Sequence, residues 1–175
     1  YDVEEAKKLL AEAGYPDGFE MTFHSTKGRY LQDAEIAEMV AGMWTAIGVK
    51  ANVEFMEWSS FVELRNSGKN KDAYLLALGN SMFDAANALD WYNFERFKGQ
   101  IDYYNEEVEE LLAAAAKNMN PEEREQQYIK AQHLLAEDTA HIVLHQESIN
   151  VGVSDAINYT PTMDEIIYVD SITKK

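Results

Sequence analysis

The residues whose type and spacing best suit metal chemistry are two histidines, His141 and His145. A four-residue spacing on a helix would let both imidazoles bind one zinc ion. The run between them, Ile142-Val143-Leu144, is instead typical of a strand, on which the two rings lie about 13 Å apart by rise. We therefore expect ordinary histidines here and no metal site.

Other patterns for catalytic and phosphate chemistry are missing from the sequence. The chain has no cysteine, so it has no thiol nucleophile, thiolate zinc site or disulfide. It contains neither G-x-x-x-x-G-K-[ST] nor G-x-G-x-x-G. The run Gly79-Asn80-Ser81-Met82-Phe83 lacks the second glycine of a G-x-S-x-G nucleophile elbow. These absences disfavour a serine hydrolase, and we expect no cofactor.

Size and charge limit the function classes further. The chain has 175 residues with a net charge of −16, which disfavours binding to nucleic acid or to an anionic membrane surface. Its 46% hydrophobic content is enough for a folded core. No apolar run approaches the roughly 18 residues of a membrane span. We expect residues 1–175 to form a single domain.

The first half of the chain alternates helix and strand patterns. Asp2 and Glu5 form a capping box, and Gly14 ends the helix that follows. The expected elements after it are a strand over 19–25, a helix over 33–47, a strand over 49–56, a helix over 59–66 and a strand over 73–78. The last strand is almost continuously apolar, which predicts burial on both faces. This order predicts an α/β fold with a β-α-β-α-β core and a mostly parallel sheet.

The second half predicts flanking helices and late strands. Asn120-Pro121 begins a helix that runs to Glu137, and another helix is expected over 105–117. A helix within 85–97 is also compatible with the pattern. Residues 142–153 indicate a long late strand, and residues 166–169 a short one.

A ligand crevice in a parallel sheet lies outside the carboxyl ends of its strands. Three such ends are His24-Ser25-Thr26, Glu57-Trp58 and Gly79-Asn80-Ser81. A flat ring beside short polar side chains can hold a small solute by stacking and hydrogen bonds. The alternative is equally open at this point: Trp58 caps the core, and the polar residues only terminate strands.

A resemblance extends over nearly the whole chain. The opening Tyr1-Asp2-Val3-Glu4-Glu5-Ala6-Lys7-Lys8-Leu9-Leu10-Ala11-Glu12-Ala13-Gly14-Tyr15-Pro16-Asp17-Gly18-Phe19 resembles a signature stretch of the dipeptide/oligopeptide-type solute-binding proteins of bacterial ABC transporters. Further stretches match in order and spacing: Asp33-Ala34-Glu35-Ile36-Ala37, Ile47-Gly48-Val49-Lys50, Glu57-Trp58 with Arg65 and Gly68, Lys71-Asp72-Ala73, Tyr104-Asn105-Glu106-Glu107-Val108, the helix with Glu123-Arg124, and Ala131-Gln132 through Glu137-Asp138. The set is specific because its members are colinear.

The resemblance implies a periplasmic-binding-protein-like lobe, the carboxyl-terminal one of a larger two-lobed protein. Such a protein closes its two lobes over a peptide or similar small solute and delivers it to the permease subunits of an ABC importer. The implied location is periplasmic or extracellular, with a membrane anchor in the full-length form as one option. The tail 155–175 would pack on the amino-terminal lobe.

The resemblance also implies site residues. Trp58 and Arg65 match positions that face the ligand, and the loop from Gly79 to Asp84 matches a segment that lines the cleft. The expected ligand-binding set is His24, Trp58, Arg65, Asn80, Ser81, Phe83 and Asp84. Arg65 as a surface charge and Phe83 as a buried plug are the alternatives. Leu78 and Ser81 replace the usual Trp and the Asp that pairs with a peptide amine, which leaves the solute open.

The resemblance thus implies a binding protein that is not an enzyme. Two other classes remain open. A small acidic metal-dependent hydrolase would need titrating groups such as His24 or Asp84 in a cleft. A protein-interaction domain would expose a contiguous apolar patch over Trp91, Tyr92 and Phe94.

Overall fold

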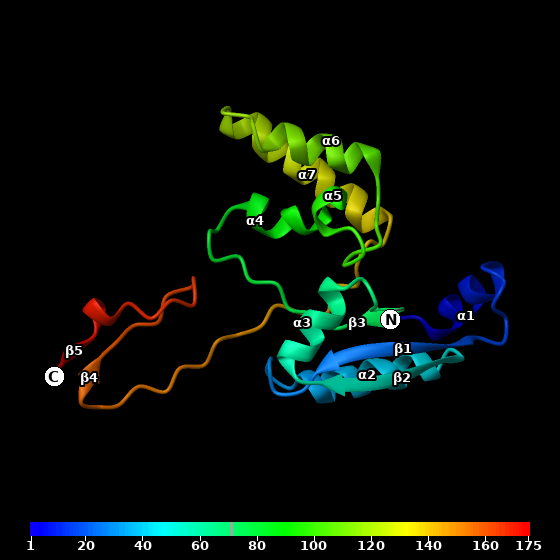
Figure 1. Cartoon of the computed structure of the whole chain (residues 1–175), viewed down its shortest axis with the longest axis horizontal. Helices are drawn as coiled ribbons and strands as arrows, with labels where there is room; N and C mark the ends of the chain where they lie inside the picture. Colours follow the sequence, from blue (N-terminus) through cyan, green and yellow to red (C-terminus); the bar gives the residue numbers. More distant parts are fainter. Residues whose placement is uncertain (71) are drawn as a thin grey trace. The chain divides into compact units, whose positions relative to one another are not determined.

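The chain divides into two compact units, Tyr1–Ala77 and Leu78–Lys175. This structure is a computed structural model that describes residues 1–70 and 72–175 (Figure 1). Lys71, which belongs to one of the matched stretches, lies outside the described residues. We predicted one domain over 1–175, whereas the backbone contacts separate two units, so a single working lobe stays a prediction.

Unit 1 contains the predicted parallel sheet. Its elements are α1 (Val3–Glu12), β1 (Phe19–Thr26), α2 (Asp33–Thr45), β2 (Val49–Met56), α3 (Trp58–Asn66) and β3 (Ala73–Tyr74). The strand order is β2-β1-β3, and both pairings are parallel. The β1–β2 register runs from Phe19 opposite Val49 to Thr26 opposite Met56. The β-α-β-α-β prediction is confirmed.

Helices α2 and α3 cover opposite faces of this sheet. Phe23 on β1 packs edge-on against Trp44 of α2, with ring centroids 5.0 Å apart. The next residue, His24, is the register partner of Tyr74, whose ring meets Phe61 of α3 at 5.9 Å. Because neighbouring residues of a strand point to opposite faces, the unit has three layers.

Strand β3 is shorter than predicted. The sequence indicated a strand over 73–78, but the ladder covers only Ala73–Tyr74, and the Leu75 N–H donates one further bond to the His24 carbonyl at 2.9 Å. Burial on both faces was also wrong, because β3 lies at the sheet edge and residues 73–77 are only half-buried. An apolar run extends as a strand only while a neighbouring strand accepts its hydrogen bonds.

Unit 2 begins with helices. They are α4 (Ala85–Leu89), a 3₁₀ turn η1 (Asp90–Tyr92), α5 (Phe94–Phe97), α6 (Glu106–Ala115) and α7 (Pro121–Glu137). Helices α6 and α7 lie side by side (Figure 1). The buried core consists of Leu89, Tyr92, Val108, Ala115, Tyr128 and Leu135. Both long helices were predicted, and the helix suggested within 85–97 is three short pieces.

The predicted late strands are wrong. Residues 142–153 form no strand, and six of their apolar side chains are exposed: Ile142, Val143, Leu144, Ile149, Val151 and Val153. The strand expected over 166–169 is an irregular segment leading into the 3₁₀ turn η2 (Val169–Ser171). The ladder found instead joins β4 (Ile157–Asn158) to β5 (Thr173–Lys174) in antiparallel fashion. In the described part of the chain, residues 142–153 have no strand edge beside them, and an extended segment needs one to satisfy its backbone groups.

In the part of the chain that the structure describes, no helix combines the length and hydropathy needed to cross a bilayer.

Candidate functional site

The loops that leave the carboxyl ends of β1 and β2 form a candidate site in unit 1. Residues 27–32 follow β1, and Glu57 and Trp58 follow β2. The strands are paired in register up to Thr26 and Met56, so both loops leave the sheet at the same edge. Trp58 is the first residue of α3, and the Glu57 carboxylate caps that helix by accepting from the Ser59 N–H at 2.9 Å.

A buried carboxylate holds the loop after β1. Asp33 is 2% exposed, and its oxygens accept from the Thr26 hydroxyl and from the backbone N–H groups of Gly28 and Arg29, each at 2.9 Å, and from that of Tyr30 at 3.2 Å. Burial acts to raise the pKa of Asp33, but these hydrogen bonds outweigh it and the pKa is lowered. The carboxylate is therefore charged at neutral pH and shapes the whole loop.

The loop presents a cation over aromatic rings. The Arg29 guanidinium carbon lies 4.9 Å from the centre of the Trp58 ring system and 5.3 Å from that of Tyr30. Tyr30 and Trp58 meet edge to face at 6.1 Å, and Trp58 stacks on the buried Phe61 at 5.8 Å. Trp58 is half-buried. It therefore packs on the core through Phe61, as the core-capping interpretation predicted, and it also contacts the exposed Arg29. Contact of Trp58 with a solute stays a prediction. We call Arg29, Tyr30 and Trp58 the edge cluster.

Two other predicted residues of unit 1 are buried. Arg65, in the last turn of α3, is 9% exposed, so the alternative of a surface charge is wrong. Burial raises the pKa of Tyr74, and the positive charge of Arg65 opposes that rise. His24 is 6% exposed, with Nδ1 3.7 Å from a Glu54 carboxylate oxygen. Contact of Arg65 or His24 with a solute stays a prediction.

In unit 2, the segment from Gly79 to Phe83 forms an exposed turn. The Phe83 backbone N–H donates to the Asn80 carbonyl at 3.1 Å, and the side-chain amide of Asn87 donates to the Gly79 carbonyl at 3.4 Å. Asn80 and Ser81 are exposed, and Phe83 is 62% exposed, so the alternative of a buried plug is wrong. Contact of Asn80, Ser81 and Phe83 with a solute stays a prediction.

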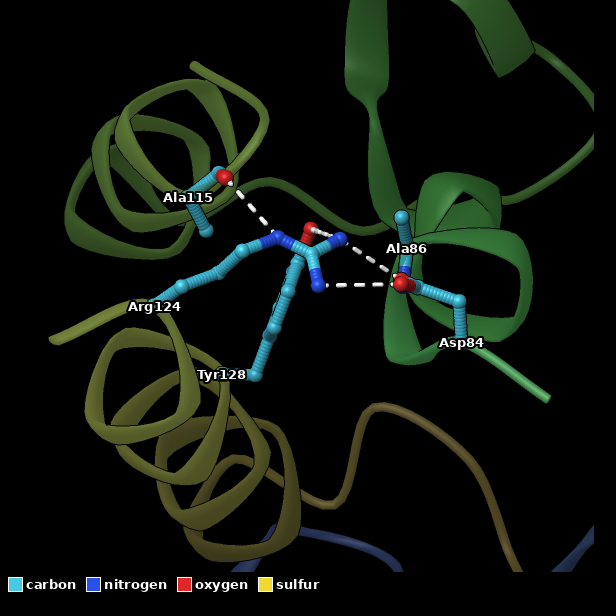
Figure 2. A network of polar contacts seen from close by, with 5 residues as sticks. All are labelled: Asp84, Ala86, Ala115, Arg124 and Tyr128. Carbon is cyan, nitrogen blue, oxygen red and sulfur yellow. Dashed lines mark hydrogen bonds and ion pairs between the residues drawn. The ribbon is translucent and has the colours of Figure 1, made fainter. Parts of the chain in front are cut away.

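Asp84, directly after this turn, is engaged inside unit 2 (Figure 2). Its Oδ1 accepts from the Ala86 N–H at 2.8 Å and so caps α4. The Arg124 guanidinium forms a fork with both carboxylate oxygens, at 2.7 and 2.9 Å. The hydrogen bonds from Arg124 hold the pKa of Asp84 below its usual range. A further bond from Asp84 to a solute stays a prediction.

The structure groups the predicted residues only in part. It places Trp58 in the edge cluster of unit 1, and it places Asn80, Ser81 and Phe83 in one turn of unit 2 with Asp84 directly after that turn. Sequence reasoning missed Arg29, Tyr30, Asp33 and Arg124. The first two could have been found, because an Arg-Tyr pair lies in the short loop after a predicted strand end. Arg124 carried no local signal, since its partner lies 40 positions away.

The patch expected of an interaction domain is not formed as predicted. Tyr92 is 7% exposed and belongs to the core of unit 2. Trp91 stacks on Phe97 with centroids 4.7 Å apart, and the Phe94 ring meets Tyr104 at 5.1 Å. These rings pack on neighbours in pairs rather than forming one exposed surface.

Metal ligands do not gather in the described residues. Across 1–70 and 72–175, no three His, Cys, Asp or Glu side chains are placed to hold one ion. His141 Nδ1 contacts the Tyr92 hydroxyl, and partial desolvation lowers the pKa of His141, although His141 and His145 are both exposed.

Residues 1–100 match the family model described as "Bacterial extracellular solute-binding proteins, family 5 Middle". The chain is 29% identical to heme-binding protein A of Haemophilus influenzae over 92% of its own length. It is 30% identical to the glutathione-binding protein GsiB of Salmonella typhimurium over 85% of the length of this chain. None of these matches supports the hydrolase alternative.

The fold is similar to that of solved relatives. The dipeptide-binding protein of Pseudoalteromonas sp. SM9913, solved with Met-Leu, superposes with a TM-score of 0.69 at 28% identity over 80% of this chain and 29% of that chain. This chain spans 29% of the length of heme-binding protein A and 31% of that of GsiB.

Proposed function

Because this chain belongs to the family 5 bacterial extracellular solute-binding proteins, we propose that it is part of the solute-binding component of an ABC importer. The observation that carries the proposal is the edge cluster, in which Arg29, Tyr30 and Trp58 gather at the carboxyl end of a parallel sheet. That edge is where ligands of parallel sheets bind.

The chemistry of the edge cluster favours a small solute that combines an acidic group with an apolar or aromatic part. A guanidinium binds a carboxylate through two parallel hydrogen bonds, and an indole offers a flat apolar face. Peptides, glutathione and heme all carry carboxylates, and relatives are named for binding dipeptides, glutathione and heme. The proposed solute class is therefore a small carboxylate-bearing molecule such as a peptide.

The remaining parts of the proposal concern residues and partners. We propose solute contact for His24 and Arg65 of unit 1 and, separately, for Asn80, Ser81, Phe83 and Asp84 of unit 2. An amino-terminal lobe would close over the solute, with the tail 155–175 packed on that lobe, and permease subunits would receive the solute. The proposed location is periplasmic or extracellular, and the proposed role is binding without catalysis.

The test uses the two-lobed protein that this proposal implies, with isothermal titration calorimetry against Met-Leu, glutathione and heme. At least one probe is expected to bind. Arg29→Gln should weaken that binding about 10- to 100-fold, because a charge-assisted hydrogen bond contributes about 1.5–3 kcal/mol. Lys27→Gln is the matched control, since Lys27 is an exposed cation of the same loop. Failure of all three probes to bind, or equal affinity with Arg29→Gln, would contradict the proposal.

A further inference from the structure

The turn from Gly79 to Phe83 holds a conformation that its own sequence does not favour. Phe83 has φ = 52°, in the left-handed region that bulky side chains rarely adopt. Its side chain is 62% exposed, and the neighbouring Met82 is 73% exposed, so burial of these two side chains does not hold the turn. Strained backbone of this kind persists only where surrounding contacts enforce it.

The nearest strong contacts are those of the next residue. Asp84 accepts the capping bond from the Ala86 N–H at 2.8 Å and two bonds from the Arg124 guanidinium at 2.7 and 2.9 Å. A fork of two parallel hydrogen bonds sets direction as well as distance, so it fixes the orientation of the Asp84 carboxylate.

Arg124 is itself held from other sides. Its Nε donates to the Ala115 carbonyl at the end of α6 at 3.2 Å, and Nη2 donates to the Tyr128 hydroxyl at 3.2 Å. Its guanidinium carbon lies 4.9 Å from the centre of the Tyr128 ring. Figure 2 shows the side chain extended between α6, α7 and the start of α4. Arg124 thus ties the start of α4 to the long helices.

We infer that Arg124 is a positioning residue for the solute site: through Asp84 it holds the Gly79–Phe83 turn in its strained shape and so sets where Asn80 and Ser81 point. This inference rests on the proposed function only in taking the Gly79–Phe83 turn to be part of a solute site. The restraint itself is a property of unit 2 and is measurable without a solute.

The first test measures hydrogen exchange of the Phe83 amide by NMR in the 175-residue chain, because that N–H closes the turn on Asn80. Asp84→Asn keeps a good N-cap acceptor but removes the charge that pairs with Arg124. We expect it to speed exchange of the Phe83 amide about tenfold, as does Arg124→Met. If Arg124→Met does not fold, Asp84→Asn decides alone.

The matched control is Lys130→Met. The Lys130 ammonium pairs with Glu107 and also joins α7 to α6, but the pair lies outside the network of Asp84. Lys130→Met should leave hydrogen exchange of the Phe83 amide unchanged. The Leu135 amide in the buried part of α7 should stay protected from exchange in every variant. Unchanged Phe83 exchange in Asp84→Asn, or an equal increase in Lys130→Met, would overturn the inference.

A second readout separates positioning from mere stability. In the two-lobed protein, Arg124→Met should weaken binding of whichever probe binds among Met-Leu, glutathione and heme, and Arg124→Lys should restore only part of it because an ammonium lacks the fork. A loosened turn with unchanged affinity would refute the positioning role. If the wild type binds none of the three probes, the proposed function fails, and the exchange result still decides whether Arg124 restrains the turn.

Discussion

At the scale of single residues, Asp33 holds the loop after β1 of unit 1 through its side-chain hydrogen bonds. Its buried carboxylate accepts hydrogen bonds from Thr26, Gly28, Arg29 and Tyr30. Without these bonds the backbone N–H groups of the loop would have to hydrogen-bond to water, and Arg29 and Tyr30 would no longer be positioned beside Trp58. The binding chemistry proposed for the edge cluster thus depends on a residue that need not touch the solute.

Replacing this carboxylate should weaken the fold. Asp33→Asn removes the charge from four hydrogen bonds and is expected to lower the free energy of unfolding by about 2–3 kcal/mol. Urea denaturation of the 175-residue chain measures this loss. Asp17→Asn, at an exposed turn residue, is the control and should change stability by no more than about 0.5 kcal/mol. Equal stability of the two variants would show that the Asp33 network contributes little.

The same residue should make stability depend on acid. Because the pKa of Asp33 is lower in the folded chain than in the unfolded one, its contribution is complete above about pH 4 and disappears as the pH falls through the folded pKa. The gap in urea midpoint between wild type and Asp33→Asn should therefore narrow from pH 7 to pH 3. A gap that stays constant over this range would refute a lowered pKa.

At the scale of elements, the start of the sheet depends on a close approach between two glycines. Gly18 precedes β1 and has φ = +74°, and a Cβ built on it would lie 1.8 Å from the Gly48 carbonyl oxygen. Gly48 ends the α2 segment and precedes β2. The two parallel strands can therefore begin this close together only because Gly18 carries no side chain, whereas a Cβ on Gly48 would lie at an ordinary contact distance of 3.5 Å from Gly18.

Gly18→Ala is accordingly expected to lower the free energy of unfolding by more than the left-handed backbone strain alone would. A left-handed alanine costs about 1–2 kcal/mol, and the clash with backbone should bring the total above about 3 kcal/mol. Gly14→Ala is a matched control, because Gly14 has φ = +92° with nothing within 4 Å of an added Cβ. Thermal unfolding of both variants checks the difference, and similar losses would mean that the backbone relaxes around the clash.

The start of α6 and the end of α7 are joined by a polar clasp of Tyr103, Asn105 and Asp138. The Tyr103 hydroxyl and the Asn105 amide donate to the same Asp138 oxygen at 2.7 and 2.8 Å. Burial first, and then the bond to Asp138, raise the pKa of Tyr103 to about 12. The clasp therefore contributes stability that is complete below about pH 10, the pKa of an unfolded tyrosine, and is lost as the pH rises toward 12.

Ultraviolet titration of tyrosinate tests the clasp. Subtracting the titration curve of Tyr103→Phe from that of the wild type should show one tyrosine ionising near pH 12. Asp138→Asn should move that transition to lower pH. Ionisation of this tyrosine near pH 10 in the wild type would mean that the clasp is not formed in solution.

At the scale of the whole molecule, the 175-residue chain should bind solute only weakly. A single lobe leaves one side of a solute in water, so its hydrogen bonds compete with solvent and little apolar surface is buried. Calorimetry of this chain with Met-Leu, glutathione and heme should detect no binding at micromolar concentration. Micromolar or tighter affinity would argue that the chain is a complete binding unit and not half of a cleft.

The sequence by itself determined the family, several helix starts, and the strands β1 and β2. Asp2, Asn105 and Asn120 mark helix starts because a cap is a hydrogen bond within three residues, and the period of two marks β1 and β2 because adjacent side chains face opposite ways. Tertiary structure alone decided three other features: the loop around Asp33, the fork between Asp84 and Arg124, and the absence of a strand over 142–153. Each depends on a partner that local pattern does not specify, since a buried carboxylate needs its donors and an extended segment needs a neighbouring edge.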